Sequence, residues 1–174
     1  GWIIAADVKT GDEVWRRWLV PAPGEPGSET WKDDWNAWET GGGSAWVTGS
    51  YDPDLDLIVW GIGNPAPDFD NAYRPGDNLY TNSVLGLEAD TGEIRWYFQY
   101  TPNDPWDFDE VGVHPLFDVT IDGETRKLIG HSARNGFYYT LDRETGAFVN
   151  GGQYSQLVNW TTGLDPKTGL PLEY

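Results

Sequence analysis

A short unit built around Thr-Gly recurs along this chain and constrains its fold more than any other feature. It reads AADVKTGDEVW at residues 5–15, GLEADTGEIRW at 86–96 and TLDRETGAFVN at 140–150, and a fragment, LDPKTG, follows at 164–169. In the first three copies an acidic residue lies three positions before the Thr, and in the first two a Trp follows the Gly by four. The unit predicts a strand, a tight turn with Gly at positive φ, and a second strand whose Trp packs on a neighbouring sheet.

The spacing of these units predicts a repeat architecture. Thr10, Thr91 and Thr145 are 81 and 54 residues apart, which fits one four-stranded blade of a β-propeller enlarged by an insertion and one ordinary blade. The insertion is expected at about residues 21–44, PAPGEPGSETWKDDWNAWETGGGS, which is too polar and too rich in Pro and Gly to form strands. Excursions of this length are often functional.

The rest of the chain also favours strands over helices. Its apolar residues alternate or occur in short runs, and 22 Gly and 12 Pro interrupt any helical pattern. The chain is therefore predicted to be all-β. The expected strands are 2–6, 13–20, 45–51, 57–62, 83–88, 94–100, 115–121, 125–132 and 136–142.

Charge and composition exclude several functions. A net charge of −17 with only 11 Lys and Arg argues against nucleic acid binding, which needs clustered cations. No segment approaches the roughly 18 apolar residues of a membrane span, so none is expected. The chain has 11 Trp, nine Tyr and six Phe, which either fill a core or line a site for a flat or sugar-like ligand.

Two stretches offer candidate ligand contacts. In GGGSAWVTGSYDP, Trp46 follows three glycines and Ser44, and a ring beside closely packed backbone suits a flat cofactor; a loop entering a strand is the plainer interpretation. Asn64 follows a predicted strand and precedes Pro65. Its amide oxygen is a hard ligand suited to Ca²⁺ or a similar cation, and an Asx-turn cap is the alternative.

The segment PNDPWDFDE, residues 102–110, concentrates acids between aromatic rings. In an extended chain Asp107 and Asp109 point the same way, so they can share a cation or raise each other's pKa. A solvated acidic loop is the alternative. Asp104 and Glu110 are expected to be solvated, whereas the rings at 106 and 108 are expected to pack away from the acid pair.

The segment HSARNGFYYTLDR carries a further candidate. Arg134 precedes Asn135-Gly136, a signal for a type I′ turn. Its planar fork suits the adjacent carbonyls of a quinone, and a surface charge or ion-pair partner is the alternative. His114 and His131 have no partner at metal-binding spacing and are interpreted as structural or surface residues. No Cys and no Gly-x-Ser-x-Gly motif is present, so the chain has no signature of a nucleophilic hydrolase.

Taken in order, these motifs resemble those of the pyrroloquinoline quinone (PQQ)-dependent alcohol dehydrogenases, the methanol and ethanol dehydrogenase family. The resemblance is carried by PGEPGSETW, GGGSAW, YDPDLDLIVWGIGNPAP, RPGDNLYTNSVLGLEADTG, YTPNDPWDFDE, ARNGFYYTLDR and VNWTTGLDPKTGLP. It implies an eight-bladed propeller, of which residues 1–174 form a single partial domain of about three blades. It also implies a glutamate metal ligand and an adjacent-cysteine disulfide upstream of Gly1.

The resemblance assigns roles to individual residues. Trp46 corresponds to the ring on which the quinone stacks, with Ser44 as a polar contact, and Asn64 in Gly-Asn-Pro corresponds to the amide metal ligand. Asp107 corresponds to the catalytic carboxylate, also a metal ligand, and Arg134 to the donor to the reactive carbonyl of the quinone.

The implied reaction is oxidation of a primary alcohol to an aldehyde. The metal acts as a Lewis acid on the quinone carbonyl, Arg134 supports the charge that develops there, and Asp107 takes the hydroxyl proton as hydride leaves. The resemblance also implies a periplasmic location, a cytochrome c electron acceptor and a homodimer of the full-length protein.

Asp109 refines the expected metal. In the family this position is commonly small or hydroxylated in calcium enzymes and Asp in the lanthanide branch. An extra carboxylate suits a trivalent ion of high coordination number, so a lanthanide is expected, with Ca²⁺ as the alternative. Asp68 and Phe69 stand where family members often have Trp and Asn, so substrate preference does not transfer.

Two other functions compete with this one. A non-catalytic propeller would use the same repeats as a protein-binding scaffold, but the joint presence of Trp46, Asn64, Asp107 and Arg134 counts against it. A glycosidase or sugar-binding propeller would need two carboxylates on opposite sides of a sugar, whereas Asp107 and Asp109 are expected to face one side.

Overall fold

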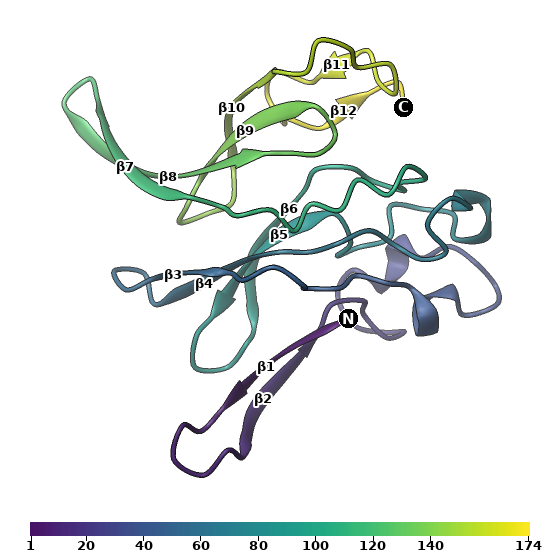
Figure 1. The fold of residues 1–174 in the computed structure, drawn as a ribbon, viewed down its shortest axis with the longest axis horizontal. Coiled ribbons are helices and arrows are strands. Elements are labelled where there is room, and N and C mark those ends of the chain that lie inside the picture. Colours follow the sequence, from purple (N-terminus) through teal and green to yellow (C-terminus); the bar gives the residue numbers. More distant parts are fainter.

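A computed structural model describes residues 1–174 as a series of antiparallel sheets with three short 3-10 helices (Figure 1). The elements are β1 (Trp2–Ala6), β2 (Glu13–Trp18), η1 (Ser28–Thr30), η2 (Ala37–Thr40), β3 (Ser50–Asp52), β4 (Leu57–Gly61), η3 (Asn71–Tyr73), β5 (Ser83–Glu88), β6 (Ile94–Gln99), β7 (Leu116–Ile121), β8 (Glu124–Ser132), β9 (Phe137–Asp142), β10 (Phe148–Gln153), β11 (Gly163–Leu164) and β12 (Pro171–Leu172). No helix in the structure has the length and apolar character needed to span a membrane.

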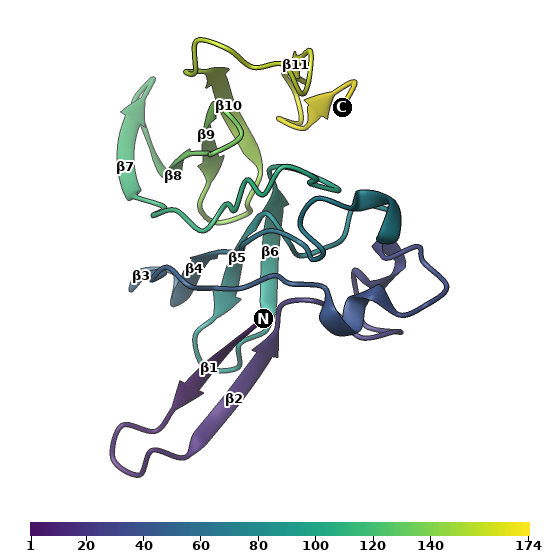
Figure 2. The ribbon, with the colours of Figure 1, turned by 45° about the vertical axis from the view of Figure 1, so that its right-hand side comes forward.

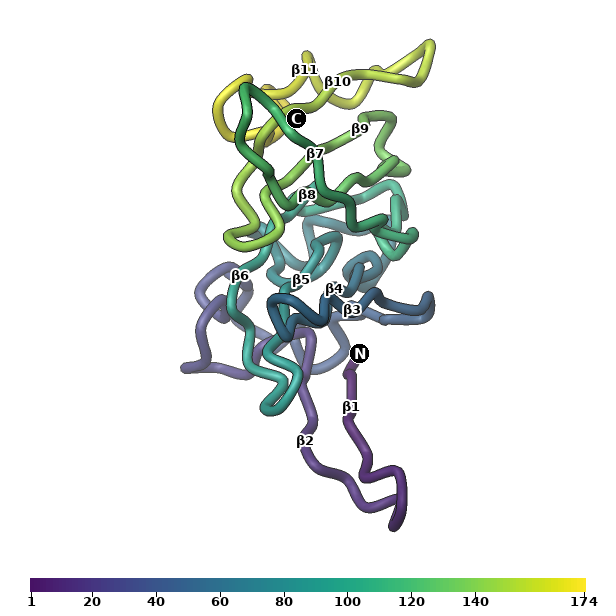
Figure 3. The backbone as a smooth tube through the Cα atoms, turned by 90° about the vertical axis from the view of Figure 1, so that its left-hand side faces the viewer, coloured from purple at the N-terminus to yellow at the C-terminus, as the bar shows by residue number.

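The strands form two four-stranded meanders between two hairpins. The sheet orders are β1-β2, β3-β4-β5-β6, β10-β9-β8-β7 and β11-β12. Figure 2 shows the two larger sheets side by side, with the β1–β2 hairpin at one end and the β11–β12 hairpin at the other. The tube in Figure 3 climbs through these sheets in chain order, from the N-terminal hairpin to the C-terminus. Consecutive sheets that each contact only their neighbours are the arrangement expected of propeller blades.

The Thr-Gly units all form the same turn. In all four copies the Gly has positive φ, and its N–H donates a 2.8 Å hydrogen bond to the carbonyl of the acidic residue four positions earlier. The pairs are Gly11 with Asp7, Gly92 with Glu88, Gly146 with Asp142, and Gly169 with Asp165. Where the acid is Asp, its side chain also accepts backbone N–H groups of the turn. The turn is therefore encoded locally, which is why the repeat was visible in the sequence.

Rings link each repeat to the next. Trp15 lies over Gly92 so closely that a methyl group at that Gly would overlap the indole, and its Nε1 donates to the Ala89 carbonyl at 2.9 Å. Trp96 lies over Gly146 in the same way. In the third unit, which lacks the Trp, Phe148 covers Gly169. The predicted packing of Trp on a neighbouring sheet is confirmed, and its target is the Thr-Gly turn of the following repeat.

The main core lies between the two four-stranded sheets. It contains side chains of β4 to β6 packed against side chains of β8, β9 and the turn between them: Leu57, Val59, Val84, Trp96, Phe98, Tyr100, Ile129, Ala133, Phe137, Tyr139 and Leu141. A second cluster joins the N-terminal hairpin to β5 through Ile3, Leu19, Ile62, Leu79, Tyr80, Leu85 and Leu87. Because both clusters span sheet boundaries, neighbouring sheets hold each other in place.

The predicted strand at 45–51 is wrong, because only β3 at its end forms a ladder. The preceding backbone pairs elsewhere: Gly43 N–H donates to Asn64 O, Gly63 N–H donates to Ser44 O, and Gly42 bridges Pro65. This pairing places Ser44 beside Asn64. The 21–44 segment contains η1 and η2 and no strand, as expected.

The sequence also missed β10, β11 and β12. Strand β10 includes Asn150-Gly151-Gly152, residues with poor strand propensity, and forms because it pairs with β9. The last two strands contain only two residues each, which is too short for a periodic signal.

Candidate active site

Asp109 joins two of the predicted site residues. The Asn64 N–H donates to Asp109 Oδ1 at 3.1 Å, and Arg134 Nη1 lies 3.4 Å from Asp109 Oδ2. The Asp109 side chain is 13% exposed and the Arg134 side chain 55%. These residues come from the loop after β4, the loop before β7 and the turn after β8. Asn64, Asp109 and Arg134 therefore lie in one cluster, although they come from three separate loops.

Ser44 belongs to the same cluster, through the glycine that separates it from Asp109. A Cβ at Gly63 would lie 2.5 Å from Asp109 Oδ1 and 3.1 Å from Ser44 Oγ. Only Gly permits this approach. Trp46, two residues further along, is 61% exposed and its ring has no aromatic partner, so it presents an open face.

The Asn64 side chain is oriented by its amide nitrogen. Nδ2 donates to Pro65 O at 3.0 Å and to Asp68 Oδ1 at 2.9 Å. The amide oxygen accepts no hydrogen bond, so the alternative Asx-turn cap is not formed. A carboxamide oxygen left free in this way is a suitable donor for a hard cation.

The electrostatics of Asp107 reflect this crowding of acids. Desolvation, followed by the charges of Asp109 and Asp68, raises the pKa of the Asp107 carboxyl, and Arg134 opposes the rise. Asp107 and Asp109 have φ of 63° and 55°. They are therefore not positions of an extended strand, so the expectation that strand alternation points both side chains the same way is wrong.

Asp104 shapes the loop that carries Asp107. The expectation that it is solvated is wrong, because its exposure is 0%. Its carboxylate accepts from Trp106 N at 2.7 Å, Phe108 N at 2.8 Å and Asn82 Nδ2 at 2.6 Å. It folds the loop around itself, with Asp107 between the two bonded amides. These donors satisfy a buried charge that would otherwise be costly.

Glu110, the other acid expected to be solvated, is also 0% exposed. It pairs with His131 and accepts backbone hydrogen bonds from Arg134 and Asn135. No sequence signal separated it from its neighbours, apart from its position directly before the apolar Val111.

Arg74 is a further residue that the sequence analysis did not single out. Its side chain is fully buried and donates to the carbonyls of Pro67, Asp68 and Asp104 and to Asn78 Oδ1. It thus ties the loop that follows Asn64 to the loop that precedes Asp107.

The turn that carries Arg134 is not the predicted type I′ turn. Gly136 N–H donates to Ala133 O at 3.2 Å, so Arg134 and Asn135 are the central residues, and of the two residues in Asn-Gly only Gly136 has positive φ. Tertiary contacts determine the geometry of this turn. The buried Asn135 amide donates to Tyr100 O, Thr101 Oγ1 and Tyr139 OH, which anchors the turn while the Arg134 side chain stays exposed.

The two histidines are structural and buried. Their rings stack with centroids 4.0 Å apart, and His114 Nε2 lies 3.1 Å from the Tyr100 hydroxyl. Trp106 and Phe108 pack together and on Trp160, so they pack away from the acids, as expected. No three His, Asp or Glu side chains in the structure form a metal-binding group; the available donors are one amide and two carboxylates.

The chain matches a known family over most of its length. The profile of the glucose/ethanol/alcohol dehydrogenase β-propeller domain, a PQQ family, matches residues 1–153. The putative dehydrogenase XoxF of Paracoccus denitrificans is 40% identical over 181 residues, covering 95% of this chain and 30% of the relative. The chain thus spans about a third or less of the length of such relatives.

Solved structures agree in fold. The quinohemoprotein alcohol dehydrogenase of Comamonas testosteroni superposes with a TM-score of 0.91 at 36% identity, over 99% of this chain and 27% of that one. A europium-containing methanol dehydrogenase superposes with a TM-score of 0.89 at 33% identity, over 100% of this chain and 33% of that one. The predicted all-β propeller fold and the predicted cofactor class, PQQ with a lanthanide or calcium ion, are confirmed at the level of the family. The chain belongs to the PQQ-dependent alcohol dehydrogenases, as a portion of their β-propeller domain.

Proposed function

We propose that the full-length protein oxidises a primary alcohol to an aldehyde with PQQ as the hydride acceptor. The carrying observation is the double contact of Asp109, which binds the Asn64 N–H with one oxygen and lies near Arg134 with the other. These contacts support the proposal because two of the proposed metal ligands and the arginine proposed to face the quinone lie in one cluster. The metal is proposed to be a lanthanide, held by Asn64, Asp107 and Asp109, with Ca²⁺ as the alternative.

Each side chain then has a defined task. Asp107 accepts the alcohol proton as the general base. Arg134 donates toward the charge that develops on the cofactor, Trp46 offers its exposed face for stacking and Ser44 offers a hydroxyl. When bound, PQQ supplies hydride acceptance and the metal supplies Lewis acidity.

The remaining assignments rest on the family. Periplasmic location, electron transfer to a cytochrome c and a homodimer of the full-length protein are proposed on that basis. They are tested separately, by fractionation of cells, by reduction of purified cytochrome c and by measuring the mass in solution.

The function is tested with the full-length protein reconstituted with PQQ and either La³⁺ or Ca²⁺. Alcohol-dependent dye reduction is expected, and Asp107→Asn should abolish it while PQQ still binds. Absence of turnover with both metals would refute the dehydrogenase assignment. Absence of PQQ binding as well would favour the protein-binding scaffold.

A further inference from the structure

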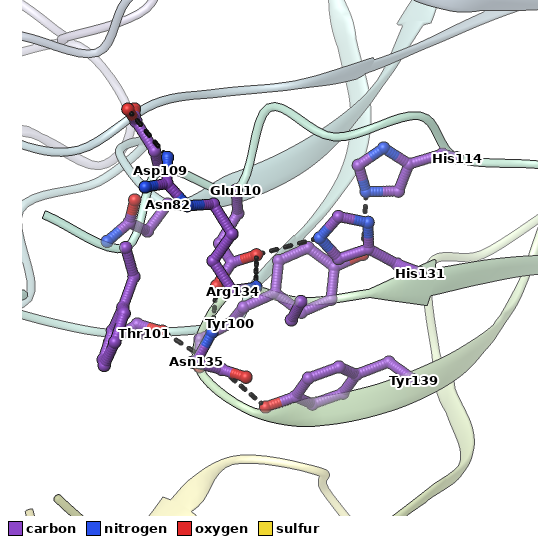
Figure 4. Close-up of polar contacts among 12 residues, drawn as sticks. Asn82, Tyr100, Thr101, Asp109, Glu110, His114, His131, Arg134, Asn135 and Tyr139 are labelled. Atoms are coloured by element: carbon purple, nitrogen blue, oxygen red, sulfur yellow. Dashed lines mark hydrogen bonds and ion pairs between the residues drawn. The ribbon is translucent and has the colours of Figure 1, made fainter. Parts of the chain in front are cut away.

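Glu110 is a fully buried acid at the boundary between the two larger sheets (Figure 4). Its Oε2 lies 2.9 Å from His131 Nε2 and accepts from the Arg134 N–H at 3.1 Å, and its Oε1 accepts from the Asn135 N–H at 3.3 Å. A carboxylate has only acceptor positions, so His131 Nε2 carries the hydrogen. Three donors therefore converge on two oxygens.

The loop from Asp104 to Glu110 is held at both ends by buried carboxylates, and the two have different partners. Asp104 accepts N–H groups of its own loop, at Trp106 and Phe108. Glu110 accepts N–H groups of the turn after β8. Asp107 and Asp109 lie between these two anchors. The hydrogen bonds of Glu110 to the turn after β8 thus fix the position of the acidic loop relative to Arg134.

The side-chain pair alone is too weak to fix that relationship. Arg134 Nη1 and Asp109 Oδ2 are 3.4 Å apart, and the Arg134 side chain is 55% exposed. Ion pairs as exposed as this one contribute little to stability. A charge-assisted hydrogen bond to a buried backbone N–H is stronger and more directional. The backbone of Arg134, rather than its guanidinium, is the anchored part.

We propose that Glu110 is a positioning residue, which orients Arg134 toward the quinone by binding the backbone N–H groups of Arg134 and Asn135. This inference rests on the proposed role of Arg134 at the cofactor. In this proposal Glu110 touches neither substrate nor cofactor; it acts on Arg134 through the turn after β8.

Glu110→Gln is a sharp test, because it keeps the shape of the side chain. If the amide oxygen occupies the Oε2 position, the NH₂ group faces the Asn135 N–H; in the other orientation it faces the Arg134 N–H. A backbone N–H cannot change its role, so either orientation loses one anchor.

Asp52→Asn is the matched control. Asp52 is also a buried carboxylate, 3% exposed, and accepts the backbone N–H groups of Asp54 and Leu55. It is the last residue of β3, at the opposite end of β4 from Asn64, and it pairs with the buried Arg143 guanidinium at 2.5 Å. Asp52→Asn therefore reports the general cost of neutralising a buried, paired acid that holds a turn.

Two measurements on the full-length protein decide the proposal. In the apo protein, hydrogen exchange over residues 130–137 should accelerate in Glu110→Gln and stay unchanged in Asp52→Asn. In titrations followed by Trp fluorescence, Glu110→Gln should weaken PQQ binding about tenfold. In an Arg134→Ala background, Glu110→Gln should weaken PQQ binding by less than about a further twofold, because the effects of coupled residues are not additive.

The outcomes separate this proposal from the function beneath it. Unchanged exchange, or equal losses of PQQ affinity with and without Arg134, would overturn the positioning role even if the wild type binds PQQ. If the wild type binds no PQQ under any metal condition, the proposed function itself fails, while the exchange measurement still tests whether Glu110 anchors the turn.

Discussion

Asp109 accepts a 3.1 Å hydrogen bond from the backbone N–H of Asn64, across 45 residues of sequence. This bond ties the Asp109 carboxylate to the backbone of Asn64. It also explains why Gly63, whose Cβ would meet Asp109, precedes Asn64.

Asp109→Ala should lower the preference for lanthanides. Loss of one negative ligand costs a trivalent ion more than a divalent one, so La³⁺ affinity is expected to fall by about tenfold or more relative to Ca²⁺. Competition against Tb³⁺, followed by Trp-sensitised luminescence of the full-length protein, measures this ratio. Asp12→Asn, at an exposed turn, serves as the control. An unchanged ratio would contradict the metal-selecting role.

Asp68 should affect metal binding through the Asn64 amide. Asp68→Asn retains an oxygen acceptor for Asn64 Nδ2 and removes the charge, whereas Asp68→Ala removes both. The Ala variant is expected to weaken binding of La³⁺ more than the Asn variant does, by several-fold, because only the hydrogen bond to Pro65 O then orients the amide. Equal effects of the two variants would show that charge alone matters. Isothermal titration of the full-length protein distinguishes them.

Gly92→Ala should destabilise the protein more than Gly11→Ala. Both glycines occupy the same turn position at positive φ, 68° and 79°, but the Trp15 ring lies against Gly92 while Gly11 faces open space. Backbone strain of about 1 kcal/mol is expected for both, with a further ~1–3 kcal/mol of overpacking only at Gly92. Urea unfolding of the full-length variants measures the difference. Equal losses would mean that the ring contributes nothing to the requirement for Gly.

Stability should fall as the pH drops below about 6.5, through His114. Burial, followed by the charge of His131, holds the pKa of His114 well below its ordinary value of 6.5, with Tyr100 and His131 against its ring. Below about pH 6.5, His114 binds a proton in the unfolded chain but not in the folded chain. Stability therefore decreases with falling pH until the pKa of His114 in the folded state is reached. One such proton contributes at most about 1.4 kcal/mol per pH unit.

His114→Gln tests this pH dependence. The variant keeps an acceptor for the Tyr100 hydroxyl and removes the titrating group. Between pH 7.5 and 5.5 the free energy of unfolding should change less steeply in the variant than in the wild type. Parallel pH profiles from urea unfolding would assign the dependence to other groups.

The sequence by itself determined the repeat and most of the strands. The Thr-Gly turn depends on a glycine at positive φ and on a bond from its N–H to the carbonyl four positions earlier, so every copy could be recognised locally. Asn64, Asp109 and Arg134 were selected by residue type and by family resemblance, and they lie together in the fold.

Only the tertiary structure decided which charged residues are buried. Asp104, Glu110 and Arg74 look like ordinary loop residues, yet each is fully buried because donors or acceptors distant in sequence satisfy it. Asn135 likewise does not form the predicted type I′ turn, because its amide donates to Tyr100 O and Tyr139 OH. A short window of sequence encodes the dihedral angles of a turn, whereas the burial of a charge depends on which remote groups the fold brings within hydrogen-bond distance.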